Sequence, residues 1–124
     1  MNFEHTDKTK EIISLVSNFI DTRVRPREKE YSDAMTTFRE SGDAWQVPSV
    51  LNELKKEAKE LGLWNFSLTG DLGYGLTNLE FAPLAEMMGV GWTSEVFNSA
   101  APDAGNREVL DKYGSDYQKE KWLK

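Results

Sequence analysis

Apolar residues recur at steps of three and four through much of the sequence, which is the spacing of amphipathic helices. The first run consists of Ile12, Ile13, Val16, Phe19, Ile20 and Val24. Thr6 or Asp7 is expected to cap this helix, and Pro26 to end or kink it near Arg25. Residues 32–47 show no sustained period, so we expect a loop there that holds at most one helical turn, at 34–39.

A second strong helix is predicted after Pro48. Its apolar face consists of Val50, Leu51, Leu54, Ala58 and Leu61. Gly62 follows at the position where a left-handed C-cap is expected. The short apolar run 63–68 then leads to Gly70, Gly73 and Gly75, and it predicts a buried extended connector that enters a glycine-bearing turn.

Two capping boxes mark the starts of later helices. They pair Thr77 with Glu80 and Ser115 with Gln118. The first box opens a predicted helix that ends at Gly89 and is kinked at Pro83, because proline has no N–H to donate to the preceding turn. The second box opens a helix that runs to Lys124.

Two more helices are predicted between these boxes. One is capped by Thr93 or Ser94 and extends through Phe97 and 100–101 until Pro102 interrupts it. The other begins at 103 or 105 and ends at Gly114. With about six helices and no convincing strand, the sequence predicts an all-α fold, an orthogonal or up-and-down bundle that forms a single domain over residues 1–124.

Composition excludes several classes of function. The chain has 124 residues, with 15 Lys+Arg against 21 Asp+Glu and a net charge of −6, which disfavours nucleic-acid binding. It has no cysteine and a single histidine, His5, so we expect no disulfide, no metal site and no thiol or histidine catalysis. No apolar run is long enough to cross a membrane, and residues 1–10 carry no leader signal, so the expected compartment is the cytoplasm.

Other candidate sites have simpler structural explanations. The run Gly-Asp-Leu-Gly-Tyr-Gly at 70–75 matches no phosphate-binding loop, and Asp71 would repel a phosphate. The acidic pairs 53/57 and 28/30 are interpreted as solvated surface charge. The methionines at 87–88, beside Trp92, suggest either an apolar pocket or ordinary core, and periodicity favours core.

The joint at 100–106 is unusual in its small residues. It reads Ala-Ala-Pro-Asp-Ala-Gly-Asn, and residues of this size let a neighbour approach closely or leave room for a channel. Asp103 and Asn106 have the side chains of helix caps, which is the interpretation that the residues alone favour. From the residues alone we therefore expect an acidic helical domain without a recognisable catalytic group.

Three stretches, in order, resemble the N-terminal helical domain of the acyl-CoA dehydrogenases. The first, 53–65, reads ELKKEAKELGLWN, and the second, 75–89, reads GLTNLEFAPLAEMMG. The third and most particular, 95–110, reads EVFNSAAPDAGNREVL and is followed by YG and QKEKWL. The match covers about residues 48–124 and points to the branch related to long- and very-long-chain enzymes. Thr69, Ser99 and Ala104 depart from the pattern only slightly.

The resemblance implies an FAD-dependent enzyme that oxidises an acyl-CoA to the trans-2-enoyl-CoA and passes electrons to an electron-transfer flavoprotein. The catalytic glutamate and most FAD contacts of the family lie in a β-domain and a C-terminal helical domain, so no catalytic and no FAD-binding residue is expected here. We expect FAD to be held only weakly by this chain, and a homo-oligomer to form when those domains are present. The family's first domain walls the acyl-chain pocket. The substrate-binding residues implied by this match are Phe97, Ala100, Ala101, Asp103 and Asn106.

Two alternatives remain open at the level of sequence. In the first, the chain is a stand-alone, non-catalytic helical module that binds an acyl chain or a partner protein. In the second, it is a structural bundle without a ligand. The last helix ends at 122–124 without a cap or a polar tail, so we expect a cut end rather than a natural terminus. A stop codon directly after Lys124 would favour the stand-alone module, and a long open frame would favour the enzyme.

Overall fold

The computed structural model describes residues 4–123, and within them all regular secondary structure is helical, without a strand. The α-helices are α1 (Asp7–Phe19), α2 (Glu28–Glu40), α3 (Ser49–Glu60), α4 (Asn78–Met88), α5 (Thr93–Val96), α6 (Asp103–Tyr113) and α7 (Asp116–Trp122). The all-α prediction is confirmed. Expectations that concern residues 1–3 and Lys124 lie outside the described residues.

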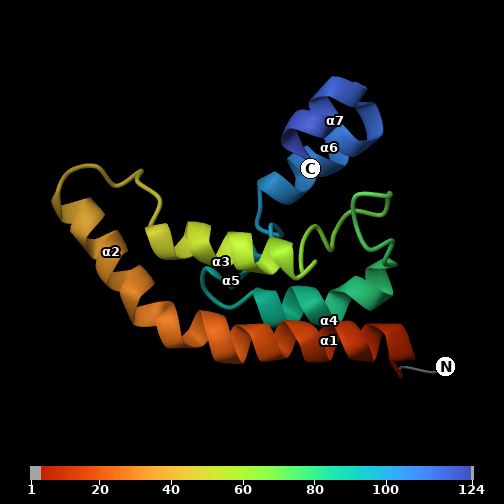
Figure 1. Cartoon of the computed structure of the whole chain (residues 1–124), viewed down its shortest axis with the longest axis horizontal. Helices are drawn as coiled ribbons and strands as arrows, with labels where there is room; N and C mark the ends of the chain where they lie inside the picture. The colour runs from red at the N-terminus through yellow and green to blue at the C-terminus, as the bar shows by residue number, and fades with distance from the viewer. Residues whose placement is uncertain (1–3, 124) are drawn as a thin grey trace.

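The predicted loop over 32–47 is wrong in its first half, where α2 forms instead. The chain passes Pro26 without leaving the helical path, through a π-helical turn, η1 (Ile20–Val24), and a 3-10 turn, η2 (Arg25–Arg27). The α-helix of α1 is interrupted there, and Figure 1 shows α2 rising at an angle from its end. N–H groups at the start of a helical turn have no acceptor within the helix. The missing N–H of Pro26 therefore costs no hydrogen bond at this position.

The signal for α2 was present in the sequence but was faint. Tyr31, Ala34, Met35 and Phe38 repeat at helical steps, and all four are partly buried. No residue of α2 is fully buried, because the helix extends from the body of the molecule (Figure 1). The true connection to α3 is the short segment 41–48.

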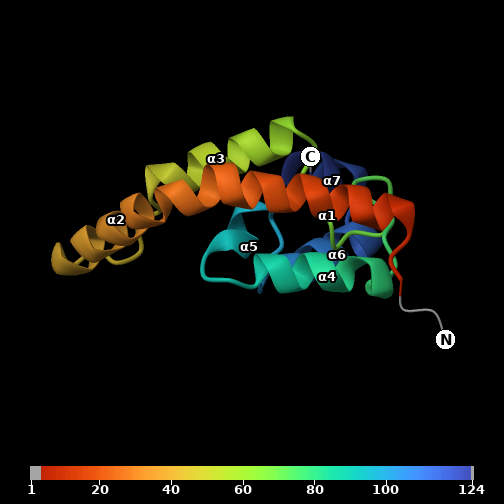
Figure 2. The same cartoon turned by 90° about the horizontal axis from the view of Figure 1, so that it is seen from below.

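The core lies where α1, α3, α4 and α5 meet. Figures 1 and 2 show α4 running alongside α1, with α3 on the other side of the core. Phe97 is at its centre, with ring centroids 5.6 Å from Phe19 and 6.2 Å from Phe66. Met88 and Trp92 are buried in the same cluster, which confirms the prediction of core for them, whereas Met87 packs at its edge and lines a hollow beside η1.

Local capping follows the sequence closely. Gly62 has φ of 74°, and the N–H groups of Gly62 and Leu63 donate to the carbonyls of Lys59 and Ala58, which closes α3 in a Schellman motif. The capping boxes that begin at Thr77 and Ser115 are both complete. Each of these motifs needs only a few consecutive residues, so the sequence alone predicts them.

The predicted helix through 93–101 is wrong, because α5 is a single turn. Trp92, rather than Thr93 or Ser94, is its N-cap. The chain leaves the helix at Phe97, and Asn98 takes a left-handed conformation with φ of 59°. A residue in that conformation cannot continue a right-handed helix, so the small residues that follow are irregular.

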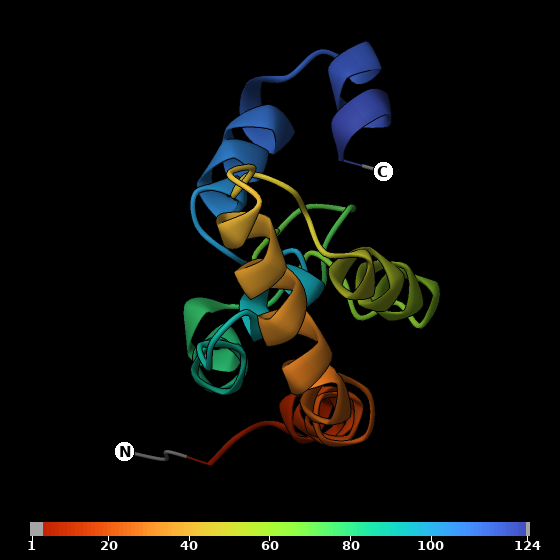
Figure 3. The same ribbon diagram turned by 90° about the vertical axis from the view of Figure 1, so that its left-hand side faces the viewer.

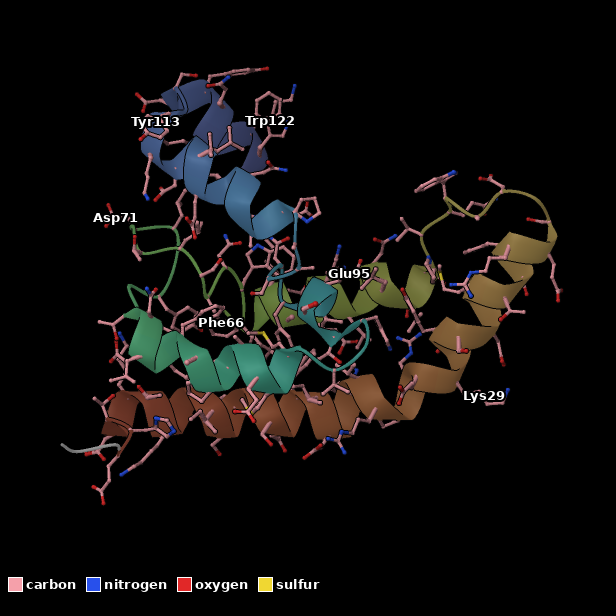
Figure 4. All side chains as sticks on the ribbon, turned by 180° about the vertical axis from the view of Figure 1, so that it is seen from behind. Lys29, Phe66, Asp71, Glu95, Tyr113 and Trp122 are labelled. Atoms are coloured by element: carbon pink, nitrogen blue, oxygen red, sulfur yellow. The ribbon has the colours of Figure 1, made fainter. Side chains whose placement is uncertain are left out.

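Helices α6 and α7 form a pair that stands off from the body, as Figures 1 and 3 show. They pack against each other, and several of their large side chains are exposed, namely Val109, Tyr113, Tyr117 and Trp122. Figure 4 shows Tyr113 and Trp122 on this pair, far from α1. Within residues 4–123, no helix has both the length and the apolar character needed to span a membrane.

Candidate functional site

The five residues expected to bind substrate all lie on one stretch, residues 97–106, which we call the 97–106 segment. It leaves α5, crosses the irregular small-residue joint and enters the first turn of α6. Ala100 is partly buried, whereas Ala101, Asp103 and Asn106 are exposed. Phe97 is fully buried beneath them, so in this chain it supports the segment rather than facing its surface.

The backbone of the 97–106 segment is bonded at both ends. The N–H of Ser99 donates to the carbonyl of Ser94 at 2.9 Å, and the N–H of Ala104 donates to the carbonyl of Ala100 at 3.0 Å. A Cβ placed on Gly105 would meet nothing within 4 Å. The segment is therefore held by backbone hydrogen bonds at both ends, and from Ser99 onward its side chains are small and mostly exposed.

A buried polar network lies under this segment, and sequence reasoning missed it. The guanidinium of Arg107, on α6, donates from Nη1 to the carbonyl oxygen of Asn98 and from Nη2 to its Oδ1. Asn98 Nδ2 donates to Asn65 Oδ1 at 2.9 Å. Asn65 Nδ2 in turn lies 3.4 Å from the carbonyl oxygens of Leu72 and Leu123. The network joins the loop after α3, the turn after α5, α6 and the end of α7.

Burial governs the electrostatics of this network. Removal from water lowers the pKa of Arg107, and the carboxylate of Asp103, 3.9 Å from Nη2, acts in the opposite direction. Asn65 and Asn98 both have positive φ, at 58° and 59°. Asparagine tolerates that region better than other residues with a Cβ, and this preference is the one local signal that pointed to the turn.

The glycine-bearing stretch 70–75 is a structural turn, as predicted. The N–H of Gly73 donates to the carbonyl of Gly70 at 3.0 Å. A Cβ on Gly73 would lie 2.1 Å from the carbonyl oxygen of Leu68, so only glycine fits this close backbone approach. Tyr74 closes the turn by donating from its hydroxyl to the carbonyl of Gly62, and burial raises its pKa.

Three of the four carboxylates in the acidic pairs considered in the sequence bind arginines. Glu53 and Glu30 both bind Arg27, at 2.8 and 2.7 Å, and Glu57 binds Arg23 at 2.7 Å. The hydrogen bond from Arg27 lowers the pKa of Glu30. A general acid needs the opposite shift, so Glu30 does not fit that role. Glu53 and Glu57 are surface ion-pair partners.

Two hollows among the described residues include none of the five expected residues. One of about 620 Å³, between the turn at 70–72 and α6–α7, is lined by Asp71, Asp111, Asp116, Glu120 and only one cation, Lys119. This acidic lining does not fit the pyrophosphate of FAD, which binds to N–H donors and cations. The other, of about 290 Å³, lies beside η1 and is lined partly by Val24, Val90 and Trp92. No group of three or more metal-ligating side chains gathers anywhere in residues 4–123.

Comparison with known proteins gives consistent matches. The family model described as "Acyl-CoA dehydrogenase, N-terminal domain" matches residues 6–124. The mouse protein "Acyl-CoA dehydrogenase family member 10" is 41% identical over 85% of this chain and 10% of its own length. The Mycobacterium tuberculosis protein named "Probable acyl-CoA dehydrogenase FadE2" is 40% identical over 100% of this chain and 30% of its own.

A solved structure gives the same result in three dimensions. The chain is similar to the solved structure described as "Structure of a putative acyl-CoA dehydrogenase from Mycobacterium abscessus", with a TM-score of 0.83 and 42% identity. The match covers 97% of this chain and 31% of that one. This chain therefore spans less than a third of the length of each relative compared.

Proposed function

Because this chain belongs to the acyl-CoA dehydrogenase family, whose N-terminal domain it matches over residues 6–124, we propose that it forms the acyl-chain wall of an FAD-dependent dehydrogenase. The proposed reaction is the α,β-dehydrogenation of an acyl-CoA to the trans-2-enoyl-CoA. The observation that carries the proposal is the 97–106 segment, which is held by backbone hydrogen bonds and whose side chains from Ser99 onward are small and mostly exposed.

The residues of this segment have the properties that an acyl chain requires. The methyl groups of Ala100 and Ala101 give apolar contact without filling the space that a long hydrocarbon would occupy. Phe97, packed between Phe19 and Phe66, holds the segment from below. Asp103 and Asn106 are exposed at the polar edge, where α6 begins. In this arrangement the wall binds the chain, orients it and excludes water from it.

The redox chemistry belongs to the rest of the proposed enzyme. FAD supplies the hydride acceptor when bound, and we assign no FAD-binding residue to this chain, since its larger hollow is acidic. The catalytic base is likewise placed outside this chain. An electron-transfer flavoprotein as acceptor, a homo-oligomeric full-length protein and a cytoplasmic location are further parts of the proposal, and they rest on the family resemblance.

The direct test is a visible absorption spectrum of the complete gene product before and after addition of a long-chain acyl-CoA. We expect flavin bands that bleach on addition. A colourless protein, or flavin bands that no acyl-CoA bleaches, would contradict the proposal. The colourless result would favour the alternative, a non-catalytic helical module that binds an acyl chain or a partner protein.

A matched pair of variants tests the wall itself. Ala101→Phe places a ring on an exposed position of the segment, so the fold tolerates it while the space for substrate shrinks. We expect the KM for a long-chain acyl-CoA to rise by about tenfold or more. Leu15→Phe, on the exposed part of α1, adds a ring of the same kind away from the segment and should leave KM unchanged. Equal effects of both variants would remove the segment from the substrate site.

A further inference from the structure

Arg107 differs in its surroundings from the arginines of η1 and η2. Arg23, Arg25 and Arg27 form ion pairs at the surface, whereas the side chain of Arg107 is only 9% exposed. Its charge has one carboxylate nearby, that of Asp103, which is itself 63% exposed and 3.9 Å away. Asp103 is therefore a weak counter-ion, and the guanidinium is satisfied mainly by uncharged oxygen atoms.

Placing a charge in this way is costly for folding. Desolvation of a guanidinium opposes burial, and an apolar side chain of similar volume is often neutral or better for stability at such a site. The feature of arginine that an apolar residue lacks is its rigid set of donors, which can hold two acceptors in a fixed geometry. Here both acceptors belong to the same residue, Asn98.

Asn98 is the residue at which the chain turns out of α5. Its left-handed backbone sets the direction of the next residues, 99–102, and thus the position of Ala100 and Ala101. One donor of Arg107 fixes the carbonyl of this turn and the other fixes its side chain, which also reaches Asn65. Arg107, on α6, therefore holds Asn98, the residue at which the chain turns toward Ala100 and Ala101.

We propose that Arg107 is a positioning residue that, acting through Asn98, fixes where the 97–106 segment stands and thereby sets which acyl chains the pocket accepts. The inference rests on the proposed function, because it gives a specificity role to the same wall. Arg107 itself lies beneath the wall and contacts no substrate. Its effect is on the depth and direction of the space in front of Ala100 and Ala101.

The first measurement is hydrogen exchange of the complete protein, followed in peptides that contain the amides of Ser99 and Ala104. Arg107→Met removes both donors, and we expect exchange in these peptides to rise by about tenfold or more while exchange in α1 and α3 stays constant. Arg107→Lys keeps the charge but loses the rigid pair of donors, so exchange in these peptides should stay nearly as fast as in Arg107→Met. Arg23→Met, which breaks a surface ion pair with Glu57, is the control and should change neither region.

Asn98→Gly keeps the experiment decisive if Arg107→Met fails to fold. Glycine accepts φ of 59° without strain and keeps the carbonyl that Arg107 binds, but it removes the side-chain oxygen and the link to Asn65. We expect a smaller local rise in exchange at the same peptides. Unchanged exchange in both variants, or a rise spread evenly over α1, α3 and the segment, would refute a positioning role.

The second measurement is steady-state kinetics with one short-chain and one long-chain acyl-CoA. We expect Arg107→Lys to change the ratio of the two KM values by about tenfold while kcat stays close to wild type, because a shifted wall alters binding more than chemistry. A wild-type protein without acyl-CoA oxidation would overturn the proposed function, and this specificity role with it. An active wild type whose KM ratio is unmoved in Arg107→Lys would overturn the positioning inference alone.

Discussion

The ring of Tyr31 stacks on the indole of Trp92, with centroids 4.2 Å apart and only 2° between the ring planes. Tyr31 lies on α2, and Trp92 is the N-cap of α5, so the stack joins the outlying helix to the body. Burial of this contact also raises the pKa of the Tyr31 hydroxyl. Since α2 has no fully buried residue, this pair is a main anchor for it.

Removing the stack should loosen α2 specifically. Tyr31→Leu keeps apolar volume but loses the aromatic contact, and we expect a loss of about 1 kcal/mol in the free energy of unfolding. Urea denaturation measures the loss, and hydrogen exchange should locate it in α2. Tyr113→Leu, at a site that is 82% exposed, is the matched control and should be nearly neutral. An equal loss in both variants would show that the stack contributes nothing of its own.

Two glycine-to-alanine changes should act in opposite directions. At Gly62, φ is 74° and a new Cβ would meet only the Tyr74 hydroxyl at 3.7 Å, so the cost is backbone strain of about 1 kcal/mol. At Gly105, inside α6, a Cβ meets nothing, and alanine should stabilise the helix by about 0.5 to 1 kcal/mol. Thermal unfolding of the two variants side by side tests both signs, and a shift in the same direction would contradict the conformational argument.

The capping box of α4 should give a defined pH dependence. The N–H of Thr77 donates to the carboxylate of Glu80 at 2.9 Å and its hydroxyl does the same, which lowers the pKa of Glu80. A lowered pKa means that this stabilisation is complete above about pH 4.5 and is lost as the pH falls through the lower value of the folded state.

Comparison with Glu80→Gln isolates that contribution, since glutamine keeps the acceptor oxygen without the charge. The wild type should be the more stable at neutral pH, and the difference should shrink as the solution is made acidic. Glu86→Gln, on the same helix but outside the box, controls for the loss of one charge. A difference that does not vary with pH would contradict the assignment.

The chain alone should not form a tight complex with FAD. Mixing residues 1–124 with FAD and separating the two by gel filtration should leave the flavin absorbance in the small-molecule fraction, because the larger hollow carries several carboxylates and one lysine. A stoichiometric yellow complex that survives the column would overturn the placement of FAD outside this chain.

The sequence predicted those features that depend on residues close together in the chain. The boxes at Thr77 and Ser115 and the cap at Gly62 involve neighbours in the chain, and all three were predicted correctly. The failure at 32–40 has a different cause, because the loop was expected there for lack of a sustained apolar period. The helical repeat of Tyr31, Ala34, Met35 and Phe38 is faint, and all four residues are only partly buried.

The candidate site likewise has one feature that the sequence predicts and others that it does not. That the five expected residues would share one segment follows from their nearness in sequence, but the burial of Phe97 beneath the others does not. The Arg107 network was beyond prediction, because its links join residues separated by 9, 33 and 58 positions. No periodicity or spacing rule indicates which distant asparagine a buried arginine will reach.

The hydrogen bond between Asn65 and Leu123 bears on the order in which the parts of the protein fold during synthesis. Asn65 reaches the carbonyl of Leu123, a buried residue just beyond α7, across 58 positions of chain. Closing so long a loop costs more entropy than forming the local caps of α3 and α4, so those caps should form first on a growing polypeptide. Until Leu123 emerges from the ribosome, one acceptor of the Asn65 amide is absent and the polar cluster is incomplete. The α6–α7 pair should accordingly be the last part of this chain to become fixed against the body.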